Sequence, residues 1–342
     1  MDYLRVMRIL ITSCGKRDYL VKWFVLAAGP KGTVHVGNSH ADSPCFALDV
    51  PHVVTPLVAS PAYIPFLLDY CSENQIDLVC PLFDEDVHCL AMHGDQFREQ
   101  GTLVLGPQRK LARLAIDKWA AHQWLTAHGI GTPFTALDLE VVRSGLDREE
   151  ISFPLMVKPR YGMGSIDVYI VHNWDELLQT FSFLTQRCHS PRGLRDKAGA
   201  YGGGDVLVQK RLVGDEFGVD VLNDLKGKPV AVVPKRKLSM SAGETWAAAT
   251  VRSTDLHLLG MELGEALGHT GNLDCDVFVV DGVPVVLEFN VRFGGGYPFS
   301  HFSGVDFPRC IAAWLDRTSI DPRWLTYTEG DSAVKSLSVR AL

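Results

Sequence analysis

The first part of the chain alternates short apolar runs with longer stretches in which apolar residues recur at helical spacing. The short runs predict strands at residues 6–12, 33–37, 77–81 and 102–105. The stretches between them predict helices at residues 19–28, 61–73 and 86–98. Strands that alternate with helices are typical of a parallel sheet with right-handed crossovers. The pattern therefore predicts an α/β domain at the start of the chain.

A turn at residues 13–17 follows the first predicted strand, where α/β folds often bind ligands. Its sequence, Ser-Cys-Gly-Lys-Arg, matches neither the dinucleotide fingerprint GxGxxG nor the phosphate loop GxxxxGK[ST]. A structural turn between strand and helix is therefore the better interpretation. A Rossmann oxidoreductase is disfavoured for the same reason.

Residues 107–128 predict one amphipathic helix that links this domain to the rest of the chain. Its apolar residues recur along one stripe, at Leu111, Leu114, Ala115 and Trp119. Gly129 is a typical C-terminal stop for a helix. The sequence Gly131-Thr132-Pro133 breaks the chain, and residues 144–150 predict a polar connector. A domain boundary is therefore expected near residues 106–135.

The second half of the chain predicts strands and helices in a less regular order. Strands are predicted at residues 153–158, 167–171, 205–210, 217–223 and 229–234, and helices at residues 174–186 and 255–267. A hairpin follows, with strands at residues 273–280 and 283–289 around the turn Asp281-Gly282. Residues 187–205 hold five glycines and six charged residues without periodicity, which predicts a long loop.

Composition and charge narrow the class of protein. The chain has 342 residues, of which 46% are hydrophobic and 21% charged, so it can bury a sizeable core. Lys and Arg total 33 against 40 Asp and Glu, and the net charge of -7 argues against nucleic-acid binding. No apolar run approaches the ~18 residues that span a bilayer. The eight cysteines form no CxxC pair, which favours buried thiols over zinc or disulfides. We expect a cytoplasmic protein.

The predicted hairpin carries the most informative polar residues. Because alternate residues of a strand share a face, Glu288, Asn290 and Arg292 point to one side. Asp274 and Asp276 share a face of the preceding strand. Carboxylate and amide oxygens suit Mg²⁺, and an arginine suits phosphate oxygens. A solvated polar face is the alternative, but three glycines follow directly and would let a ligand approach the backbone.

Three further groups are ambiguous when each is taken by itself. Lys158 ends a predicted strand before the glycine-rich turn at residues 162–165, and ammonium and backbone N–H groups together can hold phosphates. Asp117-Lys118 would ordinarily be a surface pair. Lys235-Arg236-Lys237 is either a solvated charge run or a set of cations directed at phosphate and carboxylate.

The order of these motifs is more specific than any one of them. Asp-Lys before GIGTP is followed by VKPR with GMGS, then by VQKRLVGDEFGVDV, and last by LDCDVFVVDGVPVVLEFNVRFGGG. This order resembles the ATP-grasp superfamily over residues 107–296. The resemblance is nearest to proteins of the carbamoyl-phosphate-synthase large-subunit type and their stand-alone carboxylate–amine ligase relatives. The region before residue 107 is similar to the preATP-grasp domain of the family.

The resemblance implies ATP contacts at the positions that match the family motifs. The residues implied to bind the phosphates are Lys118 and Lys158, beneath a mobile loop of Gly162, Gly164 and Ser165. Those implied at adenine are Gln209, Lys210, Arg211 and Leu212, with Glu216 at the ribose hydroxyls. Lys210 stands where many relatives carry Glu, so the contacts with the purine are left open.

The resemblance also implies which residues act on the reacting groups. Mg²⁺, or Mn²⁺ in its place, would be held by Asp276, Glu288 and Asn290. Arg292 would clamp a phosphate, and Lys235 and Lys237 would lie near the reacting carboxylate.

The implied fold is α/β at the N-terminus and α+β in the C-terminal part. It comprises a preATP-grasp Rossmann-like domain at residues 1–106, a linker helix region at 107–150, an ATP-grasp lid subdomain at 151–215 and a large subdomain with the metal site at 216–342.

The implied activity is that of an ADP-forming ligase that joins a carboxylate to an amine through an acyl phosphate. ATP and Mg²⁺ are the expected cofactors. The expected partners are small carboxylate and amine substrates, not nucleic acid or a membrane, and a homodimer is compatible with the family. Two alternatives stay open: a nucleotide-binding regulatory module without ligase turnover, and a kinase-type ATP-grasp enzyme that releases a stable phosphorylated product.

Overall fold

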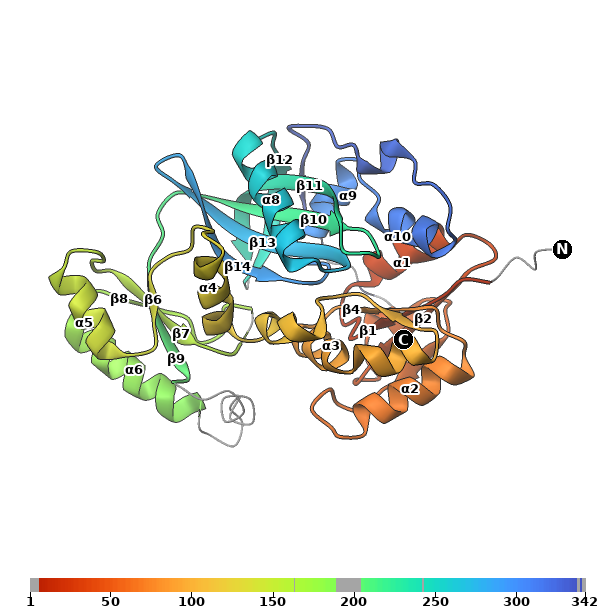
Figure 1. Ribbon diagram of the computed structural model, residues 1–342, viewed down its shortest axis with the longest axis horizontal. Coiled ribbons are helices and arrows are strands. Elements are labelled where there is room, and N and C mark those ends of the chain that lie inside the picture. Colours follow the sequence, from red (N-terminus) through yellow and green to blue (C-terminus); the bar gives the residue numbers. More distant parts are fainter. Residues whose placement is uncertain (1–5, 163, 189–203, 242, 337–338, 340–342) are drawn as a thin grey trace.

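The computed structural model describes residues 6–162, 164–188, 204–241, 243–336 and 339. Three β-sheets organise it (Figure 1). The N-terminal sheet lies at the lower right, a small sheet lies at the left, and a large antiparallel sheet lies between and above them.

The N-terminal sheet has five parallel strands in the order β3-β2-β1-β4-β5. Its strands are β1 Arg8–Thr12, β2 Thr33–Asn38, β3 His52–Val54, β4 Leu78–Pro81 and β5 Leu103–Val104. Its helices are α1 Asp18–Ala28, the 3₁₀ helix η1 Pro44–Ala47, α2 Tyr63–Glu73 and α3 Asp84–Glu99. The predicted alternation is confirmed. The sequence missed β3 because it has only three residues and both of its ends are exposed.

The single helix predicted at residues 107–128 is wrong. The chain forms a 3₁₀ helix, η2 Arg109–Ala115, and then a separate α-helix, α4 Lys118–Ala127. Asp117 separates them, because its backbone is extended (φ -112°, ψ 98°) and its side chain accepts hydrogen bonds from the backbone N–H groups of Trp119 and Ala120. An aspartate in this conformation begins a new helix rather than continuing the preceding one.

The small sheet has four antiparallel strands in the order β6-β9-β7-β8. These are β6 Thr135–Ala136, β7 Leu155–Pro159, β8 Tyr169–Val171 and β9 Val206–Lys210, with helices α5 Leu139–Asp147 and α6 Trp174–Cys188 packed against them. The sheet therefore takes strand β6 from the segment expected to be a linker. The connector predicted from residue 144 overlaps the end of α5, whose Val142 is buried in the core of this sheet. Most of the loop predicted at residues 187–205 lies outside the described residues.

The large sheet has six antiparallel strands in the order β14-β13-β10-β11-β12-β15. They are β10 Asp215–Asn223, β11 Pro229–Ser241, β12 Glu244–Thr250, β13 Gly271–Val280, β14 Val283–Asn290 and β15 Ser332–Val334. The helical elements of this part are α8 Thr254–Leu267, α9 Tyr297–Phe302, α10 Phe307–Leu315 and the 3₁₀ helix η3 Pro322–Leu325. The predicted β13–β14 hairpin is confirmed, and both residues of its turn, Asp281 and Gly282, have positive φ.

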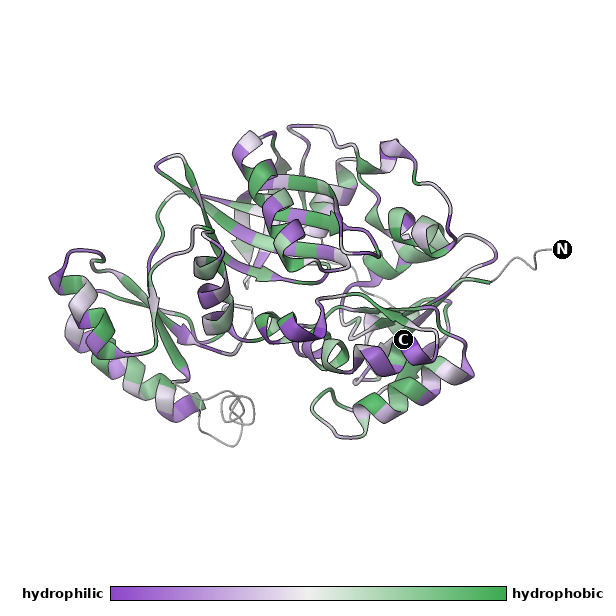
Figure 2. Ribbon diagram, in the orientation of Figure 1, coloured by the Kyte–Doolittle hydropathy of each residue, from purple (hydrophilic) through white to green (hydrophobic). Residues whose placement is uncertain are grey.

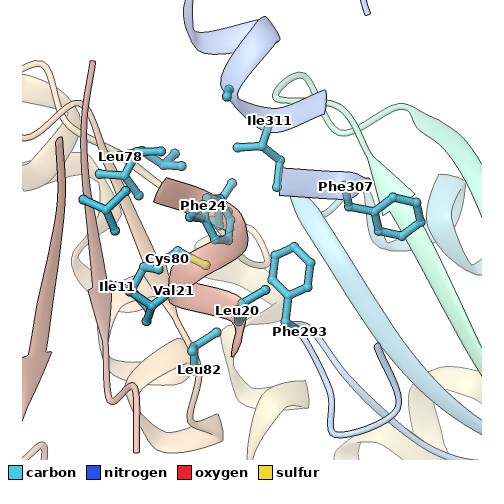
Figure 3. Close-up of a cluster of buried hydrophobic side chains, with 14 of the residues drawn as sticks. Ile11, Leu20, Val21, Phe24, Leu78, Cys80, Leu82, Phe293, Phe307 and Ile311 are labelled. Carbon is cyan, nitrogen blue, oxygen red and sulfur yellow. The ribbon is translucent and has the colours of Figure 1, made fainter. Parts of the chain in front are cut away.

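One apolar core joins the N-terminal sheet to the C-terminal part of the chain. Figure 3 shows Phe24 of α1 among side chains of the N-terminal sheet, with Phe293, Phe307 and Ile311 nearby. In Figure 2 the helices of the N-terminal and small sheets carry both hydrophobic and hydrophilic residues, as expected of helices with one buried face. No helix in the described part of the chain is long and apolar enough to cross a membrane.

Candidate active site

A cleft lies where the three sheets meet, and side chains from all three line it. The predicted site residues that line the cleft are Lys118, Lys158, Gly162, Gly164, Gln209, Lys235, Lys237, Asp276, Glu288, Asn290 and Arg292. Five predicted residues do not line it: Ser165, Lys210, Arg211, Leu212 and Glu216. Their individual roles remain predictions.

The predicted metal ligands lie on the β13–β14 hairpin. Asp276 is directly opposite Glu288 in the strand register, and Asn290 is opposite Asp274. Burial and the neighbouring carboxylates raise the pKa of Asp276 to about 7, although Lys237 opposes the shift. Among the described residues, no group of three or more His, Cys, Asp or Glu side chains could hold a metal by itself. Two carboxylates and an amide still fit Mg²⁺, because this ion commonly takes its other ligands from water and substrate phosphates.

The ammonium group of Lys237 lies between two carboxylates in this part of the cleft. Its Nζ lies 2.7 Å from Asp276 Oδ1 and 2.6 Å from Glu216 Oε1. Burial alone would lower the pKa of Lys237, but the two carboxylates hold it above its ordinary value. The ammonium group thus links the predicted ribose acid to a predicted metal ligand.

Lys235 lies deeper in the large sheet. Its side chain is 1% exposed, and Nζ lies 2.5 Å from Asp220 Oδ2. Asp220 also accepts hydrogen bonds from Ser300 and Asn272. A Cβ on Gly296 would lie 2.8 Å from the Cε atom of Lys235, so the lysine stem fills the space that the missing side chain leaves. Its ammonium group is therefore held by Asp220 within the sheet.

The two predicted phosphate lysines face the cleft from different elements. Lys158 lies near the end of β7 and is 7% exposed. Burial lowers its pKa to about 8, Glu288 partly offsets this shift, and the like charge of Lys118 adds to it. Lys118 is the first residue of α4, and its ammonium group donates to the backbone carbonyl of Gly162. A phosphate placed here would meet two cations and the N-terminus of a helix.

A buried ion pair fixes the elements that carry these lysines. Asp117 caps α4, and both of its carboxylate oxygens accept hydrogen bonds from Arg160, at 2.7 Å each. Arg113 and Tyr161 also donate to this carboxylate. The backbone N–H of Lys118 donates to the carbonyl of Arg160 at 3.3 Å. Asp117 is thus fully buried and is not part of a surface pair.

The glycine-rich turn of the small sheet reaches the large sheet. A Cβ on Gly243 would lie 2.5 Å from the backbone oxygen of Gly164, so the two backbones are in close contact. Gly164 and Ser165 both have positive φ, and Ser165 is exposed. Met163 lies outside the described residues.

The predicted adenine contacts divide between the cleft and the surface. Gln209 on β9 is 4% exposed and donates to Thr135 Oγ1 at 2.9 Å. Lys210 and Arg211 are exposed, and Leu212 is half-buried.

The N-terminal domain contributes cleft residues that the sequence analysis did not select. Arg292 Nε and Nη2 donate to the carboxylate of Asp84, the first residue of α3, at 2.6 and 3.1 Å. Burial alone would lower the pKa of Arg292, but Asp84 holds it above its ordinary value. Arg17 also lines the cleft, although its turn was interpreted as purely structural. The available signal was the position of that turn after β1, where α/β sheets commonly bind ligands.

Two family models match separate parts of the chain. Residues 9–105 match the PylC-like N-terminal domain, and residues 204–336 match the ATP-grasp described as belonging to the biosynthetic pathway with Ter operon. The resemblance of the chain to the ATP-grasp superfamily is confirmed by these matches and by its curated relatives.

Several curated ATP-grasp relatives align with most of the chain. It is 23% identical to phosphoribosylamine–glycine ligase of Chlorobaculum tepidum, with 84% of this chain and 69% of the relative aligned. It is 24% identical to D-alanine–D-alanine ligase A of Bacillus cereus, with 65% and 75% aligned. The carbamoyl phosphate synthase large chain of Mesorhizobium japonicum is 26% identical over 60% of this chain, which spans only 19% of that relative.

Solved ATP-grasp structures share the fold. The biotin carboxylase of Campylobacter jejuni superposes with a TM-score of 0.72 at 15% identity, covering 96% of this chain and 75% of that one. The L-amino acid ligase of Bacillus licheniformis superposes with a TM-score of 0.69 at 18% identity, covering 95% and 79%. The expected superfamily and fold are confirmed, and so is the expected class of enzyme, an ADP-forming ligase that makes C–N bonds.

Proposed function

We propose that this ATP-grasp protein uses ATP to activate a substrate carboxylate and then joins it to an amine, releasing ADP and phosphate. The observation that carries the proposal is the convergence of Lys118, Lys158, Glu288 and Arg292 on one cleft, from elements far apart in the sequence. Relatives named as ligases support this reaction over a regulatory binding module or a kinase.

In the first step, the substrate carboxylate attacks the γ-phosphorus of ATP, and ADP leaves. This step needs alignment and charge neutralisation more than covalent help from the protein. Lys158 and Lys118 would place cationic groups on the phosphates, and Arg292 would hold the transferred group. Asp276, Glu288 and Asn290 would hold Mg²⁺, which when bound neutralises charge on the phosphates.

In the second step, the amine attacks the carbonyl carbon of the acyl phosphate, and inorganic phosphate leaves. An acyl phosphate reacts readily with water, so the cleft must exclude solvent during this step. The contact of Gly164 with Gly243 supports a role of the glycine-rich turn as a cover. Arg292 would stabilise the departing phosphate.

The test is release of phosphate from MgATP over a panel of small carboxylates, with and without amines. The proposal predicts release that requires both a carboxylate and an amine, with a coupled product of the mass expected for loss of water. ADP formation with a carboxylate alone, together with a stable phosphorylated product and no free phosphate, would show a kinase. Nucleotide binding without turnover over the whole panel would favour a binding module.

A further inference from the structure

The end of the cleft formed with the N-terminal domain contains a cationic group without an anionic partner. Arg17 follows β1, and its Nη1 donates to the backbone carbonyls of Leu82 at 2.5 Å and Phe293 at 3.1 Å. Arg17 forms no ion pair with any residue that the structure describes. The carbonyls use only Nη1, so Nε and Nη2 remain to donate. A partly buried guanidinium held in this way is well suited to bind a carboxylate.

A carboxylate without a cationic partner lines the same cleft. Asp274 lies on β13, opposite Asn290 and two residues before Asp276. A Cβ on Gly294 would lie 1.8 Å from Asp274 Oδ2, so only glycine admits the carboxylate at this place. Within the described chain, Asp274 makes no hydrogen bond or ion pair. Its two oxygens are therefore free to accept hydrogen bonds from a ligand.

Most other charges of the cleft have a partner or a proposed ligand. Several are already paired within the protein: Arg292 with Asp84, Lys235 with Asp220, Lys237 with Asp276, and Glu244 with Lys335 at 3.0 Å. Lys118, Lys158 and Glu288 occupy the positions proposed for phosphates and metal. The cation Arg17 and the anion Asp274 belong to neither set: they have no ion-pair partner in the described chain and no proposed phosphate or metal to bind.

This inference rests on the proposed ligase function. We propose that the amine substrate is an amino acid whose ammonium group binds Asp274 and whose carboxylate binds Arg17. The opposite orientation would place like charges together. Asp274 is next to the predicted metal ligands, so it holds the nitrogen close to the reacting carboxyl group. Arg17, in the N-terminal domain, holds the carboxylate away from the phosphates.

The first experiment compares amino acids with analogues that lack the carboxylate. ADP formation is measured with each of the twenty amino acids, with their amides and with simple primary amines, in the presence of a carboxylate panel. At least one amino acid is expected to show a KM at least tenfold below that of its amide. If amides or simple amines serve equally well, the ligase function stands and this inference is overturned.

The second experiment measures binding and does not depend on turnover. Calorimetry with the same amino acids is done in the presence of Mg²⁺ and a non-hydrolysable ATP analogue. Arg17→Gln and Asp274→Asn are expected to weaken amino-acid binding at least tenfold and to leave the affinity for the ATP analogue within twofold. Arg17→Lys should recover part of the loss. Amino-acid binding without any turnover would leave this subsite in place and refute the ligase function.

Two matched controls separate the subsite from general effects of charge. Lys16→Gln removes an exposed cation next to Arg17, and Asp281→Asn removes an exposed carboxylate from the hairpin turn. Both should bind the amino acid as the wild type does. If no amino acid binds to the wild type, or if Arg17→Gln binds it normally, the inference is wrong.

Discussion

Glu288 is the residue on which the proposed metal site depends most directly. It lies opposite Asp276 in the hairpin and lines the cleft. Glu288→Gln keeps the size of the side chain and removes its charge, so the phosphates would lose a neutralising metal. We expect kcat for ATP turnover to fall by about 100-fold or more.

The measurement is ADP formation at saturating Mg²⁺, with circular dichroism to check the fold. Glu262→Gln, an exposed glutamate on α8, is the matched control and should retain wild-type turnover. Wild-type turnover in Glu288→Gln would refute the assignment of this residue to the metal.

Lys158 links burial to a dependence on pH. Without nucleotide, burial lowers its pKa to about 8, so the ammonium group is charged below that pH and loses its charge above it. Because phosphates favour the charged form, the affinity for ATP should be highest below pH 8 and fall as the pH rises further. Lys158→Ala should weaken ATP binding by roughly tenfold at pH 7 and flatten this decline.

Calorimetric titration with ATP between pH 7 and pH 9 checks both parts of this prediction. Lys228→Ala removes an exposed lysine that does not line the cleft, and it should follow the wild-type curve. An unchanged affinity in Lys158→Ala would show that the residue does not contact the phosphates.

At the scale of elements, a buried ion pair joins the start of α4 to the end of β7. Asp117 caps α4 and is 0% exposed, and its carboxylate holds Arg160. Asp117→Asn would remove the charged carboxylate that accepts two hydrogen bonds from the buried Arg160 guanidinium. Breaking a buried pair in this way costs about 3–5 kcal/mol in the free energy of unfolding. The affinity for ATP should fall as well, because Lys118 is the next residue.

Urea denaturation of Asp117→Asn is compared with that of Asp138→Asn, which changes an exposed helix cap instead of a buried ion pair. Asp138 caps α5 through a hydrogen bond to the N–H of Glu140, but that cap is exposed. Asparagine caps a helix about as well as aspartate, so Asp138→Asn should change the free energy of unfolding by less than about 0.5 kcal/mol. Equal losses in the two variants would mean that the buried pair contributes little.

At the scale of the whole molecule, the shared core holds the N-terminal domain against the large sheet. Phe24 of α1 is fully buried and meets Phe293 at a ring-centroid distance of 5.8 Å. Phe24→Ala should lower the free energy of unfolding by about 3–5 kcal/mol. Because the two sides of the cleft share this core, the KM for the substrates should rise with the loss.

Phe302→Ala is the matched control, since its ring is 63% exposed. The expected change in its free energy of unfolding is below about 0.5 kcal/mol. Urea titrations followed by fluorescence and by far-UV circular dichroism measure both variants. A wild-type midpoint for Phe24→Ala would show that the shared core does not stabilise the molecule.

Local sequence patterns determined much of this protein. Period-two and helical spacings predicted the parallel sheet, α8 and the β13–β14 hairpin, because these elements bury a regular apolar face. The turn Asp281-Gly282 was predictable because both positions need positive φ. The motif order predicted the resemblance to the superfamily and most of the predicted site residues that line the cleft.

Only the tertiary structure decided the rest, because it depends on groups far apart in the chain. The helical stripe at residues 107–128 could not show the break at Asp117, which is stabilised by Arg160, 43 residues later. Nothing in the turn at residues 13–17 indicated that Arg17 would reach the backbone of Phe293, 276 residues away. The balance of paired and unpaired charge in the cleft is likewise set by packing among three sheets, so no local pattern could contain it.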